Sequence, residues 1–133
     1  MTGKAKTYRG VFIDTYGTGR ASVREISSGS GAIAVLLGVD WIDYQSVIIG
    51  GHPFDVWVDD NGMFSHGRTP AFSVMHDSEP VLCGPAFILN GDNETGESFS
   101  LTDDEITLIL GNIRPRIISY RDGPSYTVDV LSV

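Results

Sequence analysis

The chain has 133 residues, and its 17 acidic side chains outnumber its 9 lysines and arginines, so its formal net charge at pH 7 is −8. A chain of this length can bury the core of a single domain without help from disulfides or metal, and its only cysteine, Cys83, cannot form an intrachain bridge. The acidic balance argues against general binding of DNA or RNA, which depends on neutralising phosphates. No signal peptide and no run of roughly 18 apolar residues occurs, so we expect a cytoplasmic protein without membrane contact.

Sixteen glycines and six prolines, spread along the chain, favour short strands joined by tight turns over a helical bundle. Alternating apolar and polar residues, bounded by turn signals, mark the expected strands. In chain order these cover residues 7–14, 20–26, 41–49, 54–58, 81–89, 117–120 and 126–130. The part between residues 63 and 80 is expected to be the longest irregular region, and Pro85 is expected to put its strand at an edge or a bulge.

Two short helices are expected between these strands. Residues 32–38 are apolar on all sides, which predicts a brief buried helix that Gly38 ends. The second helix has the clearest local signal in the chain. Thr102 and Glu105 have the spacing of a capping box, and Leu101 can pack against Ile106 as a hydrophobic staple.

This order of elements predicts an α+β fold, in which hairpins build an antiparallel sheet and both helices pack on one face of it. We expect a single domain over residues 7–112. Residues 113–133 would form a C-terminal β-hairpin extension. Its last strand, starting at Tyr126, alternates apolar and polar residues and would be an unprotected edge, so we expect homo-oligomers that pair through it.

Several segments resemble a small protein family that is found in phages and mobile elements and is catalogued as domain of unknown function 3846. These segments are Ser22-Val23-Arg24-Glu25-Ile26, Val56-Trp57-Val58-Asp59-Asp60-Asn61-Gly62, Cys83-Gly84-Pro85-Ala86-Phe87-Ile88-Leu89 and Ser98-Phe99-Ser100-Leu101-Thr102-Asp103-Asp104-Glu105-Ile106. After the Asn61-Gly62 turn, the chain departs from the family's usual Gly-Leu-Pro and Asn-Arg pattern. The resemblance implies a phage or mobile-element setting in a bacterial host cell and no particular activity.

Catalytic and metal-binding motifs are absent from the sequence. The three histidines, His52, His66 and His76, have neither the i, i+4 spacing of a helical metal pair nor a nearby cysteine pair. Gly29-Ser30-Gly31 lacks the frame of a nucleophile elbow. We therefore expect no catalytic residues, no metal and no cofactor. A phosphoesterase that uses His66 or His76 with a nearby acid is kept as the third hypothesis.

Arginines are the main groups in this acidic chain that can hold a phosphate in a forked geometry. The leading hypothesis is a non-enzymatic phage-type sponge that sequesters a small nucleotide-derived immune signal, such as a cyclic nucleotide or a cyclic ADP-ribose. The phosphate would be held by Arg24, Arg68, Arg114 or Arg116. The base would stack on Phe64 or Trp57, and its polar edges would form hydrogen bonds with Asn61 or His66.

The alternative hypothesis is an acidic protein-interaction inhibitor, or a nucleic-acid mimic, that blocks a host defence protein. Acidic groups such as Asp59-Asp60 and Asp103-Asp104-Glu105 could then form the working surface. Some aromatic residues could also stack on a base, but we expect most of them to belong to the core; they are Trp41, Tyr44, Trp57, Phe64 and Phe72.

Overall fold

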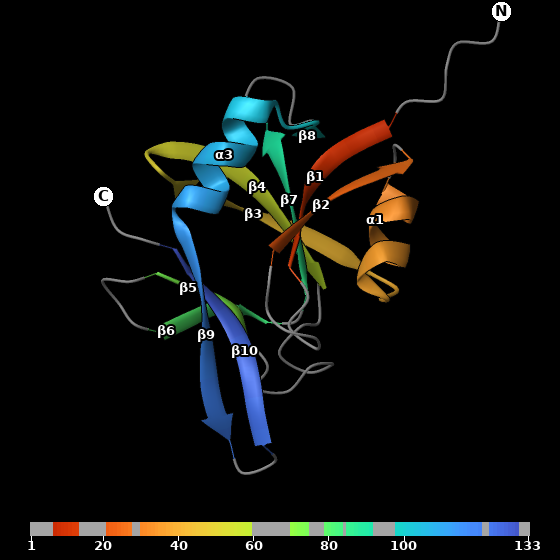
Figure 1. Ribbon diagram of the computed structural model, residues 1–133. Coiled ribbons are helices and arrows are strands. Elements are labelled where there is room, and N and C mark those ends of the chain that lie inside the picture. The colour runs from red at the N-terminus through yellow and green to blue at the C-terminus, as the bar shows by residue number, and fades with distance from the viewer. Residues whose placement is uncertain are drawn as a thin grey trace, which may run out of the picture.

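A computed structural model describes residues 7–13, 21–27, 30–59, 70–74, 79–83, 85–91, 98–120 and 123–130. These residues form two β-sheets and two helices (Figure 1). No helix in this part of the chain is long and apolar enough to cross a membrane.

The first sheet is antiparallel, with the strand order β2-β1-β7-β4-β3, and β8 pairs with the end of β7. Its strands are β1 (Thr7–Ile13), β2 (Ala21–Ser27), β3 (Ile42–Ile49), β4 (His52–Asp59), β7 (Ala86–Gly91) and β8 (Ser98–Phe99). The predicted hairpins β1–β2 and β3–β4 are both present. Gly50 and Gly51 both have positive φ, so the two-residue turn between β3 and β4 has the backbone twist that tight hairpins favour.

The two helices lie on opposite faces of this sheet, not on the same face as predicted (Figure 1). Helix α1 (Ser30–Leu37) packs Ile33 and Leu37 against Phe87 of β7. Helix α3 (Asp103–Gly111) packs Ile106 and Ile109 into a second cluster that contains the next residue of β7, Ile88. Since successive residues of a strand point to opposite faces, the two helices must cover different sides. The α+β class and the antiparallel sheet are confirmed.

A second sheet, in the order β6-β5-β10-β9, was not predicted. It consists of β5 (Pro70–Val74), β6 (Glu79–Cys83), β9 (Ile113–Tyr120) and β10 (Gly123–Val130). The expected C-terminal hairpin is therefore present, but β10 is an inner strand, because it also pairs in parallel with β5. The prediction that the C-terminal strand is an unprotected edge is therefore wrong, and the argument for oligomers that pair through this edge fails with it.

Two further expectations about the middle of the chain need correction. Part of the region expected to be irregular forms β5 and the start of β6. The expected bent edge strand over residues 81–89 is two strands in different sheets. Pro85 lies between them, and β7 is central in the first sheet, between β1 and β4.

Candidate binding surface

The described residues include only part of the predicted ligand site. Asn61, Phe64, His66 and Arg68 lie outside them, as does His76. Arg116 belongs to β9, but its side chain is likewise outside the described part. Of the predicted ligand-binding residues, Arg24, Trp57 and Arg114 are described with their side chains.

Arg24 is held in a defined orientation on the edge strand β2. Its guanidinium lies over the ring of Phe12, 5.5 Å from the ring centroid. Its Nε–H donates to Ser22 Oγ at 3.2 Å. These contacts engage one face and one N–H of the guanidinium, and the residue is exposed. The described contacts leave the two terminal nitrogens of Arg24 unused, and a guanidinium can make a forked contact with an anion through such groups.

Arg114 has a structural role at the end of α3. Its Nη1 donates to the carbonyl oxygen of Ile113 at 2.8 Å and to that of Gly111 at 3.4 Å. The last carbonyls of a helix lack partners within the helix and carry its negative dipole end, so a cation is favourable there. Arg114 follows the helix that covers one face, whereas Arg24 shares the other face with Phe12, which packs against the α1 cluster. Arg24 and Arg114 therefore lie at separate places in the fold.

Trp57 lies on the same face as Arg24, but β1 and β7 separate their strands. At the usual strand spacing, three steps across the sheet amount to roughly 14 Å. Trp57 also packs against the cluster that contains Ile33 and Leu37 of α1. A base stacked on Trp57 and a phosphate on Arg24 would thus have α1 packed between them.

A different surface stands out at the other edge of the sheet, on β3. It consists of Trp41, Asp43, Tyr44 and Ile48, which we call the β3 surface. Trp41 is 70% exposed, Ile48 66% and Tyr44 38%, although most of the five named aromatic residues were expected in the core. The ring of Tyr44 lies 4.7 Å from that of Trp57, centroid to centroid, with the planes tilted by 44°. Trp57 is partly buried, so this contact fixes Tyr44 against the sheet.

The segment of the chain that contains the β3 surface is acidic. Residues 30–59 contain four aspartates and neither lysine nor arginine. Asp40 and Asp43 are exposed, whereas Asp55 and Asp59 are buried in β4. Exposed aromatic rings within an acidic segment suit the recognition of cations and of basic peptide groups. The carboxylates of such a segment repel phosphate. This surface was missed because the spacing of Trp41 and Tyr44 looks the same for a core strand and an edge strand.

The described residues give no support to a catalytic or metal centre. His52 has its Nε2 3.8 Å from Glu105 Oε2, and its ring meets that of Phe54 edge-on at 4.8 Å. No group of three histidine, cysteine or carboxylate side chains that could hold a metal ion occurs among the residues described. The hypothetical phosphoesterase depends on His66 or His76 and remains a hypothesis.

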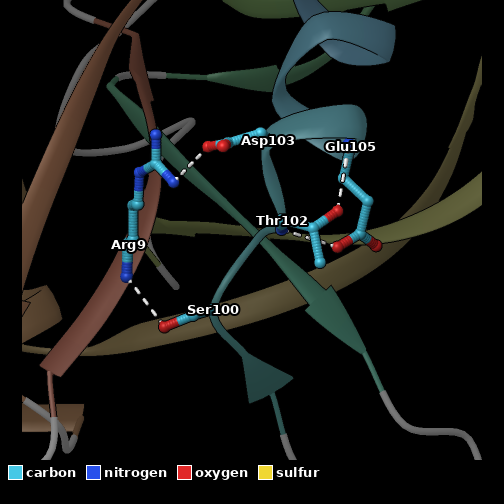
Figure 2. A network of polar contacts seen from close by, with 5 residues as sticks. All are labelled: Arg9, Ser100, Thr102, Asp103 and Glu105. Atoms are coloured by element: carbon cyan, nitrogen blue, oxygen red, sulfur yellow. Dashed lines mark hydrogen bonds and ion pairs between the residues drawn. The ribbon is translucent and has the colours of Figure 1, made fainter.

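The last of the four segments that resemble the family, residues 98–106, makes a network of polar contacts with β1, as Figure 2 shows. Ser100 Oγ accepts the backbone N–H of Arg9 at 3.0 Å, and the Arg9 side chain pairs with Asp103. Thr102 and Glu105 form the predicted capping box, with bonds of 2.8 and 3.2 Å. These contacts tie β1 to the start of α3, so this motif serves the structure; the sequence did not single out Arg9.

A family model described as domain of unknown function (DUF3846) matches residues 11–114. The chain belongs to this family. The match begins in β1 and ends at the second residue of β9, so it spans the strands of the first sheet, both helices and the β3 surface. No curated protein and no solved structure matches the chain. Family membership therefore names no activity.

Proposed function

We propose that this protein is a non-enzymatic binding protein that engages a basic region of a partner protein through the β3 surface. The observation that carries this proposal is the exposure of Trp41, Tyr44 and Ile48 in a segment that has four aspartates and neither lysine nor arginine. Aromatic residues contribute a large share of binding energy at protein interfaces. In the phage setting that the family resemblance implies, the partner is a host protein in the bacterial cytoplasm, and binding would inhibit it.

The experiment compares proteins captured from a bacterial lysate by the wild type, by Trp41→Ala/Tyr44→Ser and by Val23→Ala. Val23 is also an exposed apolar residue, but it lies on β2, at the opposite edge of the sheet. We expect a captured protein whose recovery drops at least about tenfold with the double variant and is unchanged with Val23→Ala. Its capture should also weaken as salt is raised. Equal recovery by all three proteins, or no recovery above the background of the resin, contradicts the proposal.

The nucleotide sponge remains as a second candidate because of Arg24. Its guanidinium is oriented by Phe12 and Ser22, and no described carboxylate pairs with it. Calorimetry with cyclic dinucleotides, cyclic trinucleotides and cyclic ADP-ribose isomers tests this candidate. Arg24→Ala should then lower the affinity for a bound nucleotide roughly ten- to a hundredfold, because it removes a charge-assisted hydrogen bond. Retained affinity in Arg24→Ala, or no binding by the wild type, counts against it.

A further inference from the structure

Strand β3 pairs with β4 along its whole length, from Ile42 to Ile49. On its other side, no described strand pairs with it. Eight residues of regular strand correspond to an edge of roughly 26 Å. A long edge presents a row of backbone donors and acceptors to any extended chain that comes near, and proteins usually guard such edges.

One hydrogen bond shows which groups point outward from this edge. The backbone N–H of Tyr44 donates to Oδ1 of Asp43 at 2.8 Å. An amide that donates to the carboxylate of the preceding residue is not aimed at β4, so Tyr44 turns its N–H to the side away from β4. Because the direction alternates along a strand, Ile42, Ser46 and Ile48 also turn their backbone groups outward.

We propose that β3 accepts an extended, basic segment of the partner as an additional strand of the first sheet. This inference rests on the proposed function and specifies how the partner binds. Main-chain hydrogen bonds would supply affinity along the edge, and side chains on the two faces would supply specificity.

The positions along β3 specify the chemistry of the incoming strand. On the face of α1 it meets Tyr44 and Ile48, which suit apolar or aromatic side chains. On the other face it meets Asp43 and Gln45, both exposed, which suit lysine or arginine. The partner segment therefore alternates basic residues with apolar ones. A lysine or arginine beside Trp41 would also gain a cation–π contact.

Charge decides against a second copy of this chain as the occupant. Two copies paired through β3 would bring together two segments with four aspartates each and no lysine or arginine, on chains that each carry a net charge of −8. Like charges across an interface oppose association, whereas a basic segment gains from the same field.

The test uses a nine-residue capped peptide that alternates lysine with valine and tyrosine, measured by calorimetry. Two further peptides have the same sequence, with alternate backbone amides N-methylated in one register or in the other. Only one of the two registers directs its amides toward β3. We expect one methylated peptide to bind at least about tenfold more weakly than the parent, and the other to bind about as well. Equal effects of the two methylation patterns, or no binding of the parent peptide, would overturn the proposal.

Amide hydrogen exchange locates the bound peptide. Strand addition should slow exchange at Ser46 and Ile48, whose N–H groups face outward, and leave Asp43, Gln45 and Val47 unchanged because β4 already protects them. Peptide-induced protection on β2 instead of β3 would count against strand addition.

Two variants that each remove one carboxylate charge form a matched pair, in which Asp43→Asn is the test and Asp104→Asn is the control. Asp43→Asn should weaken binding of the peptide roughly three- to tenfold and flatten its salt dependence. Asp104→Asn removes the same charge from an exposed position on α3 and should leave the affinity unchanged. If Trp41→Ala/Tyr44→Ser loses the captured protein while the two N-methylated peptides behave alike, strand addition fails and the proposed function stands. If the double variant captures as well as the wild type, the proposed function fails as well.

Discussion

At the residue scale, the short segment before α3 joins two distant parts of the chain. Ser100 Oγ accepts a hydrogen bond from β1 and donates one to the carbonyl oxygen of Thr7 at 3.2 Å. Leu101 is buried, and its N–H donates to the carbonyl oxygen of Arg9 at 2.8 Å. Thr102 then starts the helix. A motif of this kind fixes the entry of α3 onto the sheet, so its residues are expected to matter for stability and not for binding.

Thr102→Ala removes the capping hydroxyl and should lower the free energy of unfolding by about 1 kcal/mol. Thr107→Ala makes the same chemical change at an exposed position inside the helix and should be neutral or slightly stabilising, because alanine favours helices. Arg9→Met breaks an ion pair whose side chains are both substantially exposed, so it should cost less than Thr102→Ala. Urea denaturation measures all three. A larger loss for Thr107→Ala than for Thr102→Ala would contradict the role of the cap.

Gly10 is a second residue whose replacement has a clear expected result. A Cβ at this position would lie 2.5 Å from the carbonyl oxygen of Ile88 and 2.6 Å from the ring of Phe87. Neither the backbone of the central strand nor a fully buried ring can move easily, so Gly10→Ala should destabilise the fold by roughly 1–3 kcal/mol.

Gly31→Ala is the control for this prediction, because a Cβ there meets nothing within 4 Å. In a helix this change should stabilise the protein by up to about 1 kcal/mol. Thermal unfolding of the two variants distinguishes them, and a stable Gly10→Ala protein would mean that β1 and β7 lie further apart than described.

At the element scale, the direction of the backbone groups in β3 gives an opposing pair of proline substitutions. Ser46 turns its N–H away from β4, where no described strand pairs with it, so Ser46→Pro should fold with a loss of no more than about 1 kcal/mol. Gln45→Pro removes an N–H that bonds to β4 and should cost about 3 kcal/mol or more. Circular dichroism during thermal unfolding compares them. Similar melting temperatures for the two variants would show that the assignment of outward groups is wrong.

The elements that the sequence predicted well are those with local signals. The capping box of α3 needs only Thr102 and Glu105, and the β3–β4 hairpin needs only its Gly50-Gly51 turn. Helix α1 was predicted, but its residues are apolar on all sides, so no stripe on it indicates which face of the sheet it covers. The placement of the helices on one face was wrong for this reason.

Pairing between distant segments left no signal in the sequence. Strands β5 and β10 meet in parallel across some fifty residues of chain, as in the pair Phe72 and Val128. The candidate site shows the same limit. The sequence identified Arg24 and Arg114 as cations, but which faces they occupy depends on the sheet order, and the use of Arg114 at the end of α3 depends on where that helix ends.

At the scale of the whole molecule, charge and edge geometry together predict the behaviour in solution. The net charge of −8 and the carboxylate of Asp43, at the edge of β3 away from β4, oppose pairing of two β3 strands. Replacing Asp43 by valine removes that carboxylate and extends the apolar surface of a strand at the end of the described strand order. We expect Asp43→Val to self-associate as its concentration rises.

Analytical ultracentrifugation over a concentration series checks this prediction. Asp104→Val is the control, since it makes the same substitution at an exposed position on α3, away from any strand edge. It should sediment like the wild type. Equal self-association of both variants would indicate nonspecific hydrophobic association instead of pairing through the edge of β3.

The junction between α3 and β9 has a mechanical consequence. A single residue, Asn112, separates the helix from the strand, and its side chain donates to the carbonyl oxygen of Leu108 at 2.8 Å. Just beyond it, Ile113 is buried in the core cluster that also holds Ile106 and Ile109. Because no flexible linker separates the two elements, a rotation of the second sheet would be transmitted directly to the last turn of α3. A load on β9 would therefore reach the core of the first sheet as a rotation of one helix end.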